Sequence, residues 1–269
     1  MKGGKAMSSL SDYYDALYDE WGRLERHRLE FEMTKRALDE HVPEISDILD
    51  VGGGPGRYSI YLAQKGHNVT LFDLSEKLVE QAGSNAEKHG AVLKQRIVGN
   101  VLELDAYLPD EYYDAVLCMG PLYHLLEEEE RKTAVSQCIA RLKPGGILIA
   151  SFISAFAPIL DLMSSDAESI SEYKDWLLKN LSDGRNNDIA GFTQAYFADP
   201  ESIIPFFFGF QLRTIRLMAA EGLGMPLEDS LMQLPEDKFQ EWIDLFYEIA
   251  DHKATLGACG HFLYIGKKI

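Results

Sequence analysis

The stretch that decides the fold is residues 48–58, which read Ile48-Leu49-Asp50-Val51-Gly52-Gly53-Gly54-Pro55-Gly56-Arg57-Tyr58. An apolar run ends near an acid and then breaks into four glycines and a proline. Beyond the break, Tyr58, Tyr61 and Leu62 recur at helical spacing, so the pattern predicts a strand, a tight turn and a helix. Glycines let the backbone approach a ligand closely, and a helix start offers it free N–H groups. The stretch therefore predicts a site for a nucleotide-like ligand.

The spacing of the glycines separates this turn from the dinucleotide-binding fingerprint. That fingerprint has a glycine at the sixth position of G-x-G-x-x-G, where this chain has Arg57. The chain instead has G-x-G-x-G, on Gly52, Gly54 and Gly56, preceded by Asp50. A nicotinamide-dependent dehydrogenase is thus the disfavoured enzyme of this fold class.

Four further stretches follow the turn in order, each ending or following a strand-like apolar run. They are Val69-Thr70-Leu71-Phe72-Asp73, Val98-Gly99-Asn100-Val101, residues 113–119 and Leu142-Lys143-Pro144-Gly145-Gly146. Together with the glycine turn, these stretches resemble the motifs of class I S-adenosylmethionine-dependent methyltransferases, over roughly residues 45 to 153. The resemblance implies an α/β, Rossmann-like sheet of seven strands, in the order 3-2-1-4-5-7-6, with the last strand antiparallel and helical lid insertions.

The remaining chain completes this architecture. We expect a helix over residues 11–40 that breaks near Gly22, and later strands over 92–98, 146–153, 210–220 and 260–267. Residues 1–44 would form an N-terminal helical lid, and residues 45–269 a methyltransferase domain with insertions at about 155–196 and 221–258. Both insertions leave the carboxyl ends of strands, so we expect them to cover the ligand side and set substrate choice. They could equally form a dimer surface.

The resemblance implies S-adenosyl-L-methionine as cofactor and S-adenosyl-L-homocysteine as product. Asp73 stands 21 positions after Gly52, where a carboxylate can accept hydrogen bonds from both ribose hydroxyls. The alternative is that Asp73 or Ser75 only caps the following helix. Asn100 would accept a hydrogen bond from the adenine amino group. The implied cofactor residues are Asp50, Gly52, Gly53, Gly54, Gly56, Tyr58, Asp73, Leu74, Asn100, Val101, Met119, Gly120, Tyr14 and Trp21.

The two aromatic residues at the end of that set lie before the first strand. In the family, a segment at this place covers the cofactor, and Tyr14, Tyr18 and Trp21 are the matching region. The alternative is that these aromatic side chains only pack the helix onto the domain.

Methyl transfer from a sulfonium is an in-line displacement, so the protein mainly has to align the reacting atoms and exclude water. A general base is needed only if the acceptor must lose a proton. Residues 120–125 resemble the Gly-Pro-Leu-Tyr-His-Leu loop of many small-molecule methyltransferases and would border the methyl group. His124 is the candidate base and Tyr123 its orienting neighbour; the alternative is a structural histidine bonded to backbone. His261 is expected to be a core or edge residue of the last strand.

Composition bounds the partners. The formal charge of −17 opposes binding to a phosphate backbone, so we expect no nucleic-acid partner. The basic residues Arg23, Arg26 and Arg28 alternate with glutamates and favour a solvated helix face. No apolar run approaches the roughly 20 residues of a membrane span, and residues 1–9 lack the apolar core of a signal peptide.

The cysteines at positions 118, 138 and 259 lack C-x-x-C spacing, which favours a reducing, cytoplasmic compartment and no metal site. The sequence thus predicts an enzyme, a monomer or homodimer, that methylates a small or medium organic acceptor at O, N, C or S. The alternatives are a protein or RNA methyltransferase, or a non-catalytic, cofactor-binding regulatory subunit.

Overall fold

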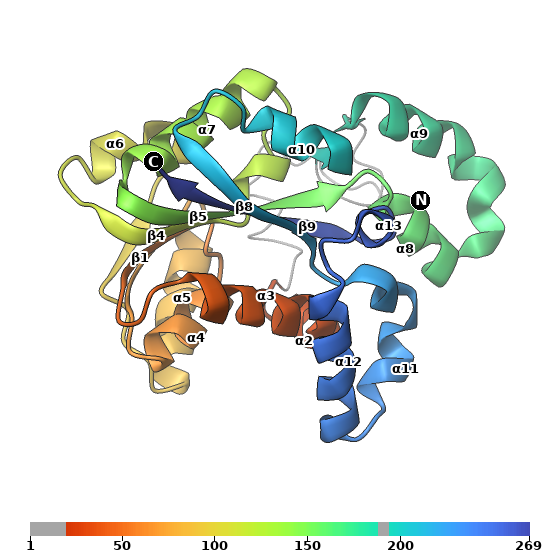
Figure 1. The fold of residues 1–269 in the computed structure, drawn as a ribbon, viewed down its shortest axis with the longest axis horizontal. Coiled ribbons are helices and arrows are strands. Elements are labelled where there is room, and N and C mark those ends of the chain that lie inside the picture. The colour runs from red at the N-terminus through yellow and green to blue at the C-terminus, as the bar shows by residue number, and fades with distance from the viewer. Residues whose placement is uncertain (1–19, 188–193) are drawn as a thin grey trace.

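A computed structural model describes residues 20–187 and 194–269. A twisted central sheet runs through the molecule between two layers of helices (Figure 1). One core cluster joins the sheet to α6, α7 and α10, and a second joins it to α3, α4 and α12. Tyr14 and Tyr18 lie outside the described residues.

The first half of the sheet is parallel and has the order β3-β2-β1-β4-β5. Its strands are β1 (Asp47–Val51), β2 (Asn68–Asp73), β3 (Gln95–Val98), β4 (Tyr113–Cys118) and β5 (Leu142–Ser154). The helices that connect them are α4 (Arg57–Gln64), α5 (Glu76–Lys88), α6 (Leu104–Tyr107), which follows the 3-10 turn η1 (Val101–Glu103), and α7 (Glu128–Ala140). Because parallel strands end at one edge, the turns after β1, β2, β3 and β4 meet there.

The last two strands close the sheet as predicted. β9 (His261–Lys268) pairs antiparallel with β5, and β8 (Leu212–Ala219) pairs antiparallel with β9. Numbered along the chain, β8 and β9 are the sixth and seventh predicted strands, so the order 3-2-1-4-5-7-6 is confirmed. Two short strands were not predicted: β7 (Ala195–Ala198) pairs with the end of β5, and β6 (Arg185–Asn186) pairs with β7.

The N-terminal helix breaks at His27 and not near Gly22. The described part consists of α2 (Glu20–Arg26) and α3 (Arg28–His41), and His27 has φ −106° and ψ 68°, outside the helical region. A side chain from a distant segment caps the second of these helices. The Glu228 carboxylate accepts the backbone N–H of Leu29 at 2.7 Å, which satisfies a free donor at the start of α3.

The two insertions are mainly helical. The first contains α8 (Ala157–Ser165), the 3-10 turn η3 (Ala167–Ser169) and α9 (Ile170–Asp183), and α10 (Pro200–Phe206) follows β7. The second contains η4 (Gly222–Leu227), α11 (Glu228–Met232), α12 (Glu236–Glu248) and α13 (Lys253–Leu256). Phe239, Ile243 and Phe246 of α12 pack into the core cluster of α3, so this helix extends the layer on that face. Within the described ranges, no helix is long and apolar enough to cross a membrane.

Candidate active site

The glycine turn after β1 is held against its neighbours on two sides. The backbone N–H groups of Gly52 and Gly53 donate to the Phe72 carbonyl of β2, at 2.8 and 3.3 Å. Gly52 has φ +74°, and a Cβ there would lie 2.6 Å from Cδ of Pro121 in the loop after β4. Gly54 and Gly56 also have positive φ, +52° and +91°. Glycine is required at this turn because L side chains rarely adopt such angles and because the β4 loop leaves no space.

Asp73, the last residue of β2, completes the turn. Its Oδ2 accepts the N–H of Gly54 at 2.8 Å, and its Oδ1 accepts the N–H of Ser75 at 2.9 Å. The helix cap belongs to Ser75, whose Oγ accepts the N–H of Leu78 at 3.1 Å. A carboxylate oxygen has more than one lone pair, so Asp73 can hold the turn and still accept hydrogen bonds from a ligand.

Two further polar side chains line the same region. Asp50 is buried and accepts a 2.6 Å hydrogen bond from the Ser59 hydroxyl. Burial raises the pKa of Asp50 to about 6; the Ser59 bond opposes this rise and the charge of Asp73 adds to it. Asn100 caps the 3-10 turn after β3, since its Oδ1 accepts the N–H of Leu102 at 3.0 Å.

A single pocket joins these groups to the far half of the sheet. Of the predicted site residues, the pocket is lined by Asp50, Gly52, Gly53, Gly54, Tyr58, Asp73, Leu74, Asn100, Val101, Met119, Gly120, Tyr123 and His124. Gly56 and Trp21 are not part of this lining: Gly56 begins α4 close to Ala82, and Trp21 stacks on His89 at 5.2 Å. Arg57, the residue that departs from the dinucleotide fingerprint, lines the pocket and lies over the Trp21 ring.

The loop after β4 contributes Tyr123 and His124, and the 3-10 turn η2 (Pro121–Tyr123) shapes it. The Tyr123 hydroxyl donates to the Met119 carbonyl at 3.3 Å, and the rings of Tyr123 and His124 meet edge to face at 4.7 Å. Burial lowers the pKa of His124 to about 4, although a hydrogen bond to the backbone of Gln194 opposes this shift. The imidazole is therefore neutral at pH 7 but a weak base.

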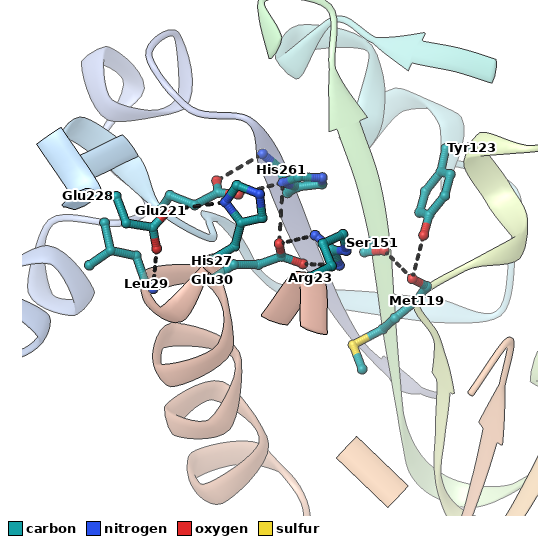
Figure 2. A network of polar contacts seen from close by, with 10 residues as sticks. All are labelled: Arg23, His27, Leu29, Glu30, Met119, Tyr123, Ser151, Glu221, Glu228 and His261. Atoms are coloured by element: carbon teal, nitrogen blue, oxygen red, sulfur yellow. Dashed lines mark hydrogen bonds and ion pairs between the residues drawn. The ribbon is translucent and has the colours of Figure 1, made fainter. Parts of the chain in front are cut away.

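The other end of the pocket holds a group of charged residues that the sequence did not predict as a site (Figure 2). Arg23 pairs with both carboxylate oxygens of Glu30, at 2.6 and 3.0 Å. His261 Nδ1 lies 2.5 Å from Glu221 Oε1 and 3.8 Å from Glu30 Oε2. The Glu221 carboxylate also accepts the backbone N–H of His261 at 3.0 Å.

Two expectations are corrected by this group. The side chain of Arg23 is only 16% exposed, so the basic stretch before residue 29 is not simply a solvated face. His261 lies in the last strand as expected, but it also lines the pocket. One signal was available: Glu30, Met33, Thr34 and Ala37 recur as i, i+3, i+4 and i+7 and are all buried, which puts a carboxylate on the apolar face of α3.

The charges within the group stabilise one another. Burial alone would raise the pKa of Glu30, but Arg23 and His261 outweigh it and lower that pKa to about 2. Burial alone would lower the pKa of His261, but the charges of Glu30 and Glu221 and the hydrogen bond to Glu221 raise it to about 9. Glu30 is thus ionised and His261 protonated at pH 7.

The same residues include atoms that could bind a metal ion. In the part of the chain that the structure describes, Glu30, Glu221 and His261 form the one set of potential ligands whose atoms lie within 4.8 Å of one another. Arg23 already pairs with both oxygens of Glu30, and Glu221 holds Nδ1 of His261. Internal ion pairs therefore account for the arrangement.

This chain is similar to proteins that are named methyltransferases. Residues 48–146 match the family model described as a methyltransferase domain. The glycine/sarcosine N-methyltransferase of Parasynechococcus marenigrum (strain WH8102) is 32% identical over 144 residues, which cover 51% of this chain and 49% of that protein. The ubiquinone biosynthesis O-methyltransferase of Rickettsia felis is 30% identical over 166 residues, 60% of this chain and 62% of that protein.

A third relative is named as a methyltransferase of tRNA. The tRNA 5-carboxymethoxyuridine methyltransferase of Escherichia coli (strain K12) is 30% identical over 129 residues, 48% of each chain. The chain thus matches less than two thirds of the length of each of these relatives. Among solved structures, the magnesium protoporphyrin IX methyltransferase of Synechocystis PCC 6803 with bound SAM has a TM-score of 0.55 at 16% identity, and covers 99% of this chain and 100% of that one. This likeness shows the fold.

Proposed function

We propose that this protein transfers a methyl group from S-adenosyl-L-methionine to a small or medium organic acceptor, since residues 48–146 match a methyltransferase domain and the whole chain has a methyltransferase-like fold. The observation that carries the proposal is the pocket at the carboxyl edge of the sheet. It joins the glycine turn and Asp73 to a mixed apolar and charged wall from α2, α3 and β9. In-line displacement requires donor and acceptor to lie in one water-excluding cavity.

The cofactor, S-adenosyl-L-methionine, would supply a methyl carbon bound to a sulfonium. In our proposal the backbone of Gly52, Gly53 and Gly54 allows its close approach. The remaining lone pairs of Asp73 bind the ribose hydroxyls, and Asn100 lies beside the adenine. Six further residues that were predicted from sequence and line the pocket would complete the cofactor site: Asp50, Tyr58, Leu74, Val101, Met119 and Gly120. Gly56 and Trp21 do not line the pocket, and Tyr14 lies outside the described residues.

The acceptor side is proposed to involve the loop after β4. Tyr123 and His124 would border the transferred methyl group. A histidine with a pKa of about 4 removes a proton poorly at neutral pH, which favours an acceptor that needs no base on the protein, such as an oxygen that is already ionised. His124 would then orient and desolvate the acceptor more than deprotonate it.

We also propose that the helical segments restrict access to the pocket. Residues 1–44 would act as a lid, because Arg23, Leu24, Glu30 and Thr34 of its described part line the pocket. The insertions at 155–196 and 221–258 would form the cap that selects the acceptor. Cys118, Cys138 and Cys259 are buried and unpaired, which suits a reducing, cytoplasmic compartment.

The small-molecule class is supported by the names of two of the relatives and by charge. The glycine/sarcosine N-methyltransferase and the ubiquinone biosynthesis O-methyltransferase are both named for small molecules. The net charge of −17 opposes the binding of a polyanion such as RNA. The tRNA methyltransferase among the relatives makes RNA the second candidate to be tested.

The test has two steps. Calorimetry with S-adenosyl-L-homocysteine should detect binding to the full chain. Methyl-labelled cofactor incubated with the protein and a metabolite extract, total RNA or cell protein should then place the label in the metabolite fraction. Label in RNA or protein alone would overturn the small-molecule class, and binding without label in any fraction would favour a regulatory subunit. Absence of binding would overturn the proposed function.

A further inference from the structure

His261 lies across the sheet from the residues proposed to hold the cofactor. Asp73 ends β2 and Asn100 follows β3, whereas His261 begins β9, beyond β4 and β5. Its pairing with Ile153, close to the carboxyl end of β5, puts it at the same end of the sheet as the glycine turn. If the cofactor occupies the β1–β3 side, as the proposed function requires, His261 belongs to the acceptor side of the shared pocket.

One nitrogen of the His261 ring is held from two separate elements. Nδ1 faces Glu221, which follows β8, and Glu30, which lies on α3. Glu221 also binds the backbone N–H of His261, and Arg23 on α2 pairs with Glu30 from its other side. These contacts fix the orientation of the ring and keep Nδ1 protonated. The raised pKa of about 9 is consistent with a ring that is charged at neutral pH.

The other ring nitrogen, Nε2, points away from both carboxylates (Figure 2). Within residues 20–187 and 194–269 it has no hydrogen-bond partner. The side chain keeps 24% of its surface exposed and lines the pocket. A rigid, charged N–H donor therefore faces the pocket without a partner among these residues.

The surrounding groups decide which ligand suits this donor. Arg23 and His261 already balance the charges of both carboxylates, which disfavours the binding of a cationic amine. The neighbouring wall includes Leu24, Ala220 and Leu263, which suit an apolar body. We propose that His261 is a positioning residue whose Nε2–H binds an anionic oxygen, a carboxylate or phenolate, on an otherwise apolar methyl acceptor.

The test uses the full chain saturated with S-adenosyl-L-homocysteine and two probes of the same size, benzoate and benzamide. Their binding is measured by calorimetry or ligand-observed NMR at pH 7 and pH 10, in wild type, His261→Gln and His67→Gln. The control residue, His67, lies before β2 at the opposite end of the sheet and accepts the N–H of Ser46. Folding of each protein is followed by circular dichroism at both pH values.

Wild type should bind benzoate at least about 10-fold more tightly than benzamide at pH 7, the scale of one hydrogen bond to a charged group. The preference should vanish in His261→Gln, vanish in wild type at pH 10, and persist in His67→Gln at pH 7. A second variant, Glu221→Gln, keeps the imidazole but removes a negative charge that stabilises its protonated form. The preference for benzoate should therefore be lost at a lower pH than in wild type.

Equal or undetectable binding of both probes to wild type, or a preference that survives in His261→Gln, overturns the proposal. Tighter binding of benzylamine than of benzoate also overturns it, since the carboxylates would then be the recognition groups. The affinity for S-adenosyl-L-homocysteine should change less than a few-fold in His261→Gln. Failure of wild type to bind S-adenosyl-L-homocysteine contradicts the proposed function, which the probe titration does not measure.

Discussion

Asp73 illustrates how one side chain can serve both the fold and a ligand site. It ends β2, and its two oxygens accept backbone N–H groups from Gly54 and Ser75. The ribose role predicted for it uses lone pairs that those bonds leave available. Removing the carboxylate should therefore change ligand affinity and local stability together, and a control has to separate the two.

Asp73→Ala should weaken binding of S-adenosyl-L-homocysteine by about 1.5–3 kcal/mol, the scale of hydrogen bonds to a charged group. The same change leaves two buried N–H groups without their partner, which should lower the free energy of unfolding by about 1–3 kcal/mol. The matched control is Asp114→Ala. Asp114 accepts the N–H of Asp47 at the opposite end of the sheet, so stability alone should change. Calorimetry that finds unchanged affinity in Asp73→Ala would disprove the ribose contact.

Two glycines, Gly52 and Gly66, allow the cost of a positive φ to be separated from the cost of a Cβ that meets the β4 loop. Gly52 and Gly66 both have positive φ, but a Cβ on Gly52 meets Pro121 and one on Gly66 meets nothing within 4 Å. Gly66→Ala should cost about 1–2 kcal/mol of folding free energy and leave cofactor binding intact. Gly52→Ala should cost more and abolish binding, because the turn and the β4 loop must move apart. Denaturant titration measures the folding free energy, and calorimetry measures cofactor binding. Normal binding by a folded Gly52→Ala protein would show that the cofactor does not bind at this turn.

At the scale of elements, α3 connects distant parts of the chain through buried carboxylates. Glu30 joins α3 to β9 through His261, and Glu228, at the start of α11, caps α3 at Leu29. These contacts link the packing of α3 to the ionisation of Glu30 and His261. Two groups have shifted pKa values that point in opposite directions, so each affects stability in its own pH range.

The stabilising contribution of His261 should be lost as pH rises. Its pKa rises from an ordinary 6.5 to about 9, so this contribution is complete below pH 6.5 and disappears by about pH 9. The contribution of Glu30, with its pKa lowered from 4.5 to about 2, is complete above pH 4.5 and is lost toward pH 2. The free energy of unfolding from denaturant titrations should fall between pH 6.5 and 9 in wild type and in His67→Gln, but not in His261→Gln. An equal fall in all three proteins would mean that His261 is not charged in the fold.

For the whole molecule, the sheet separates two helical layers (Figure 1). The pocket is lined by residues at the ends of β1, β2 and β4 and in the turns that follow them, and so lies at the carboxyl edge of the sheet. The insertion after β5 lies at this end. Its Ala157 packs with Ile153 and Phe197 in a cluster that also contacts Tyr123 of the pocket loop. Helix α8 in turn contacts η4 of the second insertion. A substitution in the first insertion can therefore shift Tyr123, on the proposed acceptor side of the pocket, without touching the glycine turn.

Trp176→Ala in α9 should raise the acceptor KM or change the preferred acceptor, with the affinity for S-adenosyl-L-homocysteine within a few-fold of wild type. Trp176 packs on Tyr173 at 6.3 Å between ring centroids, so its removal loosens the insertion. Thermal stability is followed in parallel. Leu178→Ala is the control on the same helix, since that side chain is 55% exposed. Wild-type kinetics for all acceptors tested in a stable Trp176→Ala protein would argue that the cap does not select the acceptor.

Patterns of neighbouring residues predicted the strands at the centre of the sheet and the glycine turn. Apolar runs identified β1, β2, β4 and the centre of β5, and the glycines located the turn that approaches the β4 loop. The order of the strands came from the resemblance and is confirmed by the pairing. For His124 the sequence left open a base or a backbone-bonded histidine, and the structure adds the hydrogen bond to Gln194 and a pKa lowered by burial.

The remaining features were decided by contacts between distant segments. The break at His27 accompanies a cap supplied from 199 positions away, and β7 exists because the end of β5 offers it an edge. His261 acquires its charged state from Glu221, 40 positions away, and from Glu30 on α3. No local spacing encodes such pairs, because periodicity reports which face of a helix or strand is buried and not which residue lies opposite it. Local patterns in the sequence predicted β1, β2, β4, the centre of β5 and the glycine turn, whereas only tertiary packing brought His261, Glu221 and Glu30 together at one end of the pocket.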